Sequence, residues 1–188
     1  MSVTKWQLDA SHLGIGFAVR HLMIATVRGR FGKAEGSLEV DESQPKSAHV
    51  DVTIDVASID TRQEQRDAHL RSPDFFDAQT FPTIRFVSRG IEGDPHGEFR
   101  LIGDLTIRDV TREVVLDVTN EGQGKDPWGN VRVGFSAQGK IDRRDFGLTW
   151  NQALETGGIV VGDEVKLSID AEFYRQAETK PETHLVAA

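Results

Sequence analysis

The sequence contains no cysteine among its 188 residues. A chain without thiols cannot form a disulfide scaffold, a thiol nucleophile, a zinc–thiolate centre or an iron–sulfur cluster. Basic residues are also scarce, because 22 Lys and Arg stand against 30 Asp and Glu, and the formal net charge is −8. A surface of this sign repels phosphate groups, so we expect no nucleic-acid partner.

Long apolar runs are missing as well. No stretch reaches the roughly 18 apolar residues that a transmembrane helix needs, so no membrane span is predicted. Residues 1–9 lack the basic segment and apolar core of a secretory signal. We therefore expect a cytoplasmic protein, or a periplasmic one if a leader has been removed.

What the chain does have is an alternation of apolar and polar residues. Successive side chains of a strand point to opposite faces, so each alternating segment has one apolar and one polar face. Together with the turn residues between them, these segments predict an all-β fold, an antiparallel sheet of about eight strands. The clearest alternating segments are 50–56, 99–107, 131–141 and 165–173, and shorter ones are 13–19, 38–40, 84–86 and 114–118.

Few segments are suited to helices. The sequence predicts a short helix at 62–71 and a second one near 150–155. The length favours a single domain, which we assign to residues 1–175. The polar segment 176–188 is interpreted as a C-terminal tail.

The apolar face of the sheet allows two interpretations. Small residues such as Gly103, Ala137, Gly139 and Ala171 stand among large ones on this face. In a packed sandwich they would receive bulky side chains from a facing sheet. In a barrel of about eight strands they would leave room for one small ligand. The pattern alone leaves both possibilities open.

An ordered set of motifs is more specific. The motifs are Asp9-Ala10-Ser11-His12, Ile15–Leu22, Val27–Phe31, Ser58–Thr61, Arg66–Asp77, Phe81–Phe86, Gly103–Arg108 and Arg144–Trp150. With these motifs in this order, the chain resembles the YceI family of polyisoprenoid-binding proteins from about Trp6 to about Phe173. It departs from the usual motifs at Leu13 and Asp109.

The resemblance implies an antiparallel lipocalin-like β-barrel with a long, mostly apolar pore. The pore would hold the tail of an isoprenoid quinone or another long-chain amphiphilic lipid as ligand. Family members often form homodimers, so a homodimer is expected here, and many members are exported to the periplasm. We expect a non-catalytic binding or carrier protein without metal or other cofactor.

Candidate ligand-binding residues are taken from the apolar strand faces and from the aromatic residues of the motifs. His21 is the polar member: structural hydrogen bonding is the first interpretation of this residue, and contact with the ligand's head group at the pore mouth is the functional alternative. The candidates are Phe17, Val19, His21, Phe31, Leu38, Phe86, Leu105, Ile107, Leu116, Phe135, Phe146, Trp150, Leu167 and Ile169.

Two other functions remain open at this point. The first is an enzyme that acts on a lipid-like substrate with His12 or His21 as acid or base, although no nucleophile motif is present. The second is a stress-related structural module whose apolar interior is only a core.

The residues around the predicted helix have structural interpretations. Arg66, Asp67 and Arg71 are expected to pin the helix onto the barrel through Asp60 or Asp74. The rings of Phe75, Phe76 and Phe81 are expected to close the corner between helix and strand, and one of them could line the pore.

Overall fold

The computed structural model describes residues 3–175. The predicted tail at 176–188 lies outside the described residues, so that part of the domain assignment stays a prediction. Within the described range, eleven strands form one antiparallel sheet. They are β1 (Val3–Leu8), β2 (Gly14–His21), β3 (Ala25–Phe31), β4 (Ala34–Asp41), β5 (His49–Asp55), β6 (Ile59–Asp60), β7 (Thr83–Gly93), β8 (Glu98–Ile107), β9 (Val110–Lys125), β10 (Val131–Asp142) and β11 (Val161–Arg175).

Three pairs of these strands are halves of longer, bent strands. The 3₁₀ turn η1 (Ala10–His12) separates β1 from β2, yet both halves pair with β11. Gly32 and Lys33 separate β3 from β4, and the 3₁₀ turn η3 (Val56–Ser58) separates β5 from β6. The halves still face one another, because β4 pairs with β5 and β3 pairs with β6. The sheet therefore consists of eight long strands in up-and-down order.

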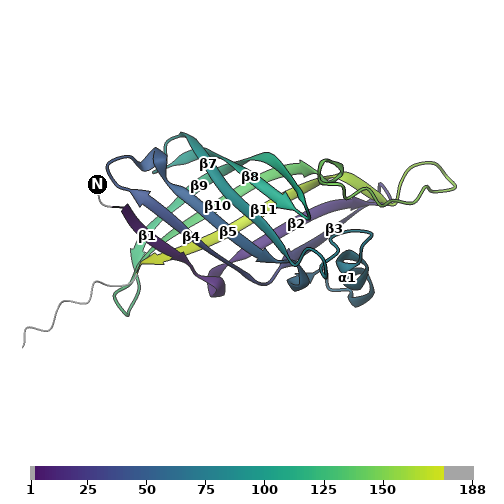
Figure 1. Cartoon of the computed structure of the whole chain (residues 1–188), viewed down its shortest axis with the longest axis horizontal. Helices are drawn as coiled ribbons and strands as arrows, with labels where there is room; N and C mark the ends of the chain where they lie inside the picture. Colours follow the sequence, from purple (N-terminus) through teal and green to yellow (C-terminus); the bar gives the residue numbers. More distant parts are fainter. Residues whose placement is uncertain (1–2, 176–188) are drawn as a thin grey trace, which may run out of the picture.

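These eight strands close into a barrel. One side of β11 pairs with β10, and the other side pairs with β1 and β2, where Leu8 faces Phe173. The last strand thus returns to the first, and Figure 1 shows an elongated barrel whose strands run obliquely to its long axis. The predicted antiparallel barrel of about eight strands is confirmed, and the sandwich alternative is wrong.

The predicted first helix is present as α1 (Glu64–Arg71), which connects β6 to β7 at one end of the barrel (Figure 1). It begins two residues later than predicted. Arg62 has a left-handed backbone with φ 61°, and the side chain of Gln63 accepts a hydrogen bond from the backbone N–H of Arg66 as the N-cap. Among residues 3–175, no helix combines the length and the apolar composition needed to cross a bilayer.

The predicted second helix near 150–155 is wrong. The chain forms an irregular loop there, with one bridge between Ala153 and Ile159. The side chain of Asn151 accepts hydrogen bonds from the backbone N–H groups of Gln152, Val160 and Val161, which competes with helix formation. The positive φ angles of Gly157 and Gly158 then complete the reversal of the chain.

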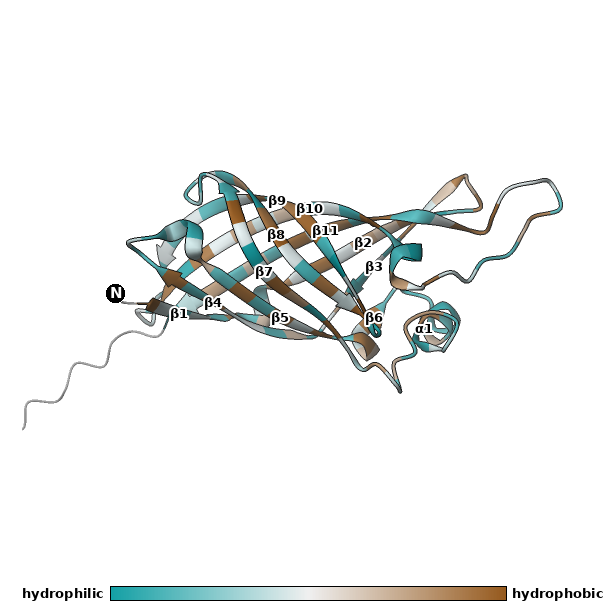
Figure 2. Cartoon of the chain, turned by 45° about the horizontal axis from the view of Figure 1, so that its top comes forward, coloured by the Kyte–Doolittle hydropathy of each residue, from teal (hydrophilic) through white to brown (hydrophobic). Residues whose placement is uncertain are grey.

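The apolar faces of the strands point into the barrel. Figure 2 shows the alternation of the sequence as brown and teal segments that follow one another along each strand. The buried residues form a large cluster that extends to the helix end, and a smaller one at the β1 end. The smaller cluster consists of Trp6, Leu8, Leu38, Val133 and Phe173.

The small residues on the inner face are covered by side chains of a neighbouring strand. An ideal Cβ at Gly103 would lie 2.4 Å from Cζ of Phe86, and one at Gly139 would lie 2.7 Å from Cδ2 of Leu116. Each glycine therefore accommodates a large side chain that leans across the sheet. The space beside these two glycines is therefore filled by side chains of the same sheet and not by a second sheet.

Candidate functional site

The barrel encloses a cavity of about 790 Å³. Inward-facing side chains from all of the long strands line it, and almost all of these side chains are apolar. The lining includes eleven of the fourteen candidate residues, and whether they contact a ligand stays a prediction. These eleven are Phe17, Val19, Phe31, Leu38, Phe86, Leu105, Ile107, Leu116, Phe135, Leu167 and Ile169.

Three candidates lie outside the lining. His21 shares the inward phase of Phe17 and Val19, but it ends β2, beyond the last residue of that strand that lines the cavity. Phe146 is buried in the core on the 3₁₀ turn η4 (Arg143–Phe146), where strand alternation no longer predicts direction. Trp150 packs edge-on against the His69 ring of α1, at a centroid distance of 4.7 Å.

Several lining residues were not predicted although the same signal marks them. Leu101 shares the inward phase of Leu105, and Val133 shares that of Phe135. Leu70 of α1 was missed for another reason. It lies on a short helix, and the alternation of a strand does not show which helical side chains point into the barrel. Phe75 and Phe76, which follow this helix, line the cavity in addition to closing the corner.

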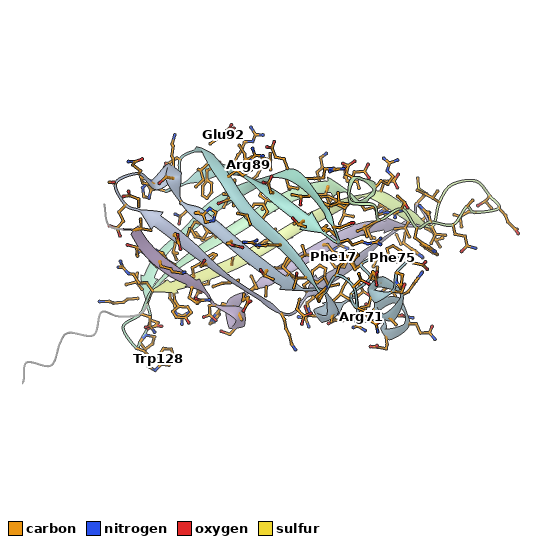
Figure 3. The ribbon with its side chains drawn as sticks, in the orientation of Figure 1. Phe17, Arg71, Phe75, Arg89, Glu92 and Trp128 are labelled. Carbon is orange, nitrogen blue, oxygen red and sulfur yellow. The ribbon has the colours of Figure 1, made fainter. Side chains whose placement is uncertain are left out.

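The helix end of the cavity is closed by aromatic and aliphatic side chains. The ring of Phe31 meets Phe76 edge-on at 5.9 Å and meets Phe17 at 5.7 Å. Phe75 is buried and lies 5.4 Å from the ring of Trp150. Figure 3 shows Phe17 and Phe75 on the same side of the molecule, beside α1.

Polar contacts hold α1 over this end. The buried carboxylate of Asp67 accepts a hydrogen bond from the backbone N–H of Thr61, at 2.9 Å. Arg66 donates to the hydroxyl and the carbonyl of Thr61, at 2.7 and 2.8 Å. Arg71 donates to the backbone carbonyls of Ala57 and Ile59. The three residues pin the helix as predicted, with different partners.

The two expected partners have other contacts. Asp60 pairs with Arg30, and Asp74 accepts a hydrogen bond from the His69 ring at 2.8 Å. A guanidinium can donate to a backbone carbonyl as well as to a carboxylate. Every residue has a backbone carbonyl, so the sequence does not show which carbonyl an arginine will bind.

Among the residues of the described range that line the cavity, Arg143 is the only one that is both charged and buried. Its guanidinium donates to the carbonyls of Leu148, Trp150 and Gly162, at 2.6, 2.9 and 2.8 Å. Burial lowers the pKa of this side chain, with Asp163 acting in the opposite direction. Its donors are directed to the loop that follows η4 and to the first residues of β11, so it organises the closed end and is not directed at a ligand.

The opposite end of the cavity is open. Among the lining residues, only Glu42, His96 and Gln123 are exposed, and all three lie at the end where β4 and β9 finish and β8 begins. Asn120 lines the same end, and its side-chain amide donates to the carbonyl of Pro95 at 3.0 Å. The cavity thus has an apolar closed end and a polar mouth. His96 occupies the place for which His21 was predicted.

A cluster of charged residues lies outside the cavity, where β1 and η1 meet β10 and β11. Asp9, His12 and Glu172 bring three metal-ligating atoms close together. However, the guanidinium of Arg132 contacts both carboxylates, and it also bonds Asp126 at 2.9 Å. Hydrogen bonds from Ser11 and Arg132 hold the pKa of Asp9 well below its usual range. These ion pairs hold the segment after β1 against β10 and β11, where the barrel closes, and the cluster is better explained by this structural role than by a metal site.

The histidines considered as catalysts are not part of the cavity. His12 bonds the carboxylate of Asp9 at 3.0 Å, and neither His12 nor His21 lines the cavity. Neither of these two histidines is therefore directed at the space where a ligand would lie.

This combination of a closed antiparallel barrel, an apolar interior and one polar mouth defines the class of lipocalin-like binding barrels. The model of the YceI-like domain matches residues 6–173, and the chain belongs to this family.

Relatives and solved structures agree with this assignment. A UPF0312 protein of Staphylococcus aureus is 37% identical over 91% of this chain and 98% of its own length. The YceI protein of Campylobacter jejuni is 32% identical over 84% of this chain and 90% of its own, with a TM-score of 0.70. A polyisoprenoid-binding domain from Saccharophagus degradans, implicated in plant cell wall breakdown, has a TM-score of 0.63. It is 14% identical over 91% of this chain and 98% of its own length, so it shows the fold alone.

Proposed function

We propose that this protein is a non-catalytic binding protein that holds a polyisoprenoid, or another long-chain amphiphilic lipid, inside its barrel. The observation that carries the proposal is the cavity of about 790 Å³ with an almost wholly apolar lining. This volume falls in the upper part of the range of roughly 300–1,000 Å³ found for small-molecule pockets. The Saccharophagus domain, which is described as polyisoprenoid-binding, supports the ligand class through its shared fold.

The energetics of such a site favour a long hydrocarbon. Each buried CH₂ group contributes roughly 0.8 kcal/mol, so a five-carbon isoprene unit contributes about 3–4 kcal/mol. Ordering of the chain lowers this gain, and so does its withdrawal from a membrane. Selectivity would then depend on the length and width of the cavity more than on individual polar contacts.

The two ends of the cavity suggest an orientation for the ligand. The tail would extend to the closed end at Leu70 and Phe76, where the lining is apolar except for Arg143, whose donors are bonded to backbone carbonyls. The head group would remain at the mouth, beside His96, Asn120 and Gln123, where water and polar side chains solvate it. No step of the proposal breaks or forms a covalent bond.

The first experiment asks what the protein carries. The purified protein is extracted with organic solvent, and the extract is analysed by mass spectrometry. We expect a long-chain isoprenoid or similar amphiphile in a reproducible ratio to protein. A protein that is empty, and that also ignores added quinones and fatty amides, would contradict the proposal.

The second experiment blocks the cavity. Leu105→Trp places an indole at a buried position of the lining, so we expect the bound lipid to be lost while the barrel stays folded. Ile102→Trp on the same strand is the control, because Ile102 has the opposite phase and lies outside the lining. Unchanged occupancy in a folded Leu105→Trp variant would refute this location of the ligand.

A carrier role, a homodimeric state and a cytoplasmic location belong to the same proposal. Light scattering on the purified chain tests the dimer, and fractionation of the source cells tests the location.

A further inference from the structure

The most exposed large apolar side chain of the described residues is Trp128, with 80% of its surface open to solvent. It lies in the turn between β9 and β10. Tryptophan carries the largest apolar surface of any side chain, and proteins normally bury most of it. A single exposed apolar side chain is common on protein surfaces, so the meaning of this ring depends on where in the molecule it lies.

The turn that carries Trp128 is firmly constructed. One carboxylate oxygen of Asp126 accepts the backbone N–H groups of Trp128 and Asn130, at 3.0 and 2.9 Å. The other accepts the Asn130 side-chain amide and the Arg132 guanidinium, each at 2.9 Å. These bonds fix the backbone of the turn, so little backbone freedom is lost when the ring docks.

The position of this turn relates it to the cavity. Gln123 of the mouth stands five residues before Trp128 on the same hairpin. Figure 3 shows Trp128 at the end of the barrel opposite to Phe75 and α1. The exposed side chain of Lys125 lies between Gln123 and Trp128 in the sequence. The ring and a cation thus stand at the open end.

We propose that Trp128 anchors the open end of the barrel on the surface of a lipid bilayer. An indole ring settles at the level of the lipid head groups, where its apolar body and its N–H group both find partners. The exposed ammonium group of Lys125, three residues before Trp128, carries the charge that attracts lipid phosphates. The inference rests on the proposed function, because a bilayer is where a long-chain ligand resides, and a docked mouth lets its tail enter without crossing water.

A second copy of the chain fits this feature less well. A stable protein interface buries roughly 800 Å² on each partner. A single projecting ring cannot supply that area. The net charge of −8 also argues against a strongly anionic surface, so the inference is specific for a zwitterionic bilayer with hydrophobic anchoring.

Vesicles of phosphatidylcholine without added ligand test the inference. Trp128 supplies most of the solvent-accessible tryptophan emission, because Trp6 is only 7% exposed and Trp150 is half-buried. On mixing with vesicles we expect a blue shift and protection from acrylamide quenching. Trp128→Ala should lower the vesicle-binding constant measured by sedimentation by about tenfold, as expected from the loss of one large apolar side chain. Trp128→Tyr should restore part of it.

A matched control uses the closed end of the barrel. Ile24 is 79% exposed on the β2–β3 hairpin, and Ile24→Ser should leave sedimentation unchanged. The inference is overturned if the emission ignores vesicles, if Trp128→Ala sediments like the wild type, or if Ile24→Ser abolishes binding equally. A blue shift that depends on protein concentration without vesicles would indicate a second copy instead. Melting curves verify that each variant is folded.

The result separates this inference from the proposed function. Vesicle binding by a protein that is empty, and that also ignores added quinones and fatty amides, would uphold the anchor and refute the ligand. A lipid-filled protein whose Trp128 ignores vesicles would refute the anchor alone.

Discussion

Arg143 and Arg144 are adjacent in the sequence but have different roles. Arg143 is 4% exposed and bonds the carbonyls of the loop that closes the barrel, and burial lowers its pKa. Arg144 is exposed and pairs with Asp142 at 2.5 Å, and its pKa is raised by that partner. The sequence shows two adjacent arginines and cannot tell which is buried, because their contacts lie up to nineteen residues away, at Gly162 and Asp163.

The Asp142–Arg144 pair predicts a pH dependence. Arg144 lowers the pKa of Asp142 from 3.8 to about 2. Since the folded pKa is the lower one, the pair stabilises the fold fully above pH 3.8, and this contribution disappears as the pH falls through about 2. We expect Arg144→Gln to melt below the wild type at pH 6, with a difference that shrinks toward pH 2. A difference that does not depend on pH would contradict this explanation.

At the scale of elements, the period of two predicted eight of the strands and their inner faces correctly, but it missed β1, β3 and β6. It could not predict that three of the strands bend, because η1 and η3 are short irregular segments within otherwise continuous ladders. It also mistook 150–155 for a helix, where the Asn151 side chain satisfies three backbone N–H groups of a loop. Local hydrogen bonds from a single side chain decided that element, and no periodicity shows them.

The fit between β7 and β8 can be tested at Gly103. A methyl group there would overlap the ring of Phe86, so we expect Gly103→Ala to lower the free energy of unfolding by about 1–3 kcal/mol through displacement of that ring. Gly90→Ala on β7 is the control, because nothing lies within 4 Å of its ideal Cβ and a change of at most about 0.5 kcal/mol is expected. Urea denaturation of both variants measures the difference. Equal stabilities would show that Phe86 moves aside at no cost.

At the scale of the whole molecule, the barrel has one closed and one open end. Phe31, Phe76 and the pinned helix α1 close one end, whereas exposed polar side chains border the other. A hydrocarbon inside such a barrel would complete the apolar core. Ligand binding and folding stability are then linked.

This linkage predicts the effect of removing the ligand. At a free ligand concentration of 100 times Kd, the folded state gains about 2.7 kcal/mol, which corresponds to roughly 5–10 °C in Tm for a domain of this size. We expect solvent-extracted, refolded protein to melt lower by this order and to recover when the extract is returned. Leu105→Trp should show no such recovery. A wild-type Tm that ignores the extract would contradict a stabilising ligand in the cavity.

The sequence by itself determined eight of the strands with their apolar faces, the first helix and the family, because these depend on the spacing of neighbouring residues and on local motifs. Only the tertiary structure decided that the sheet closes as a barrel, that His96 rather than His21 lies at the mouth, and that Phe146 and Trp150 lie outside the cavity. These outcomes depend on contacts between distant segments, such as Leu8 with Phe173, and on where each strand leaves the barrel. The alternation indicates which side chains point inward, but the boundaries of the cavity are set by the helix, the loops and the carbonyls around Arg143.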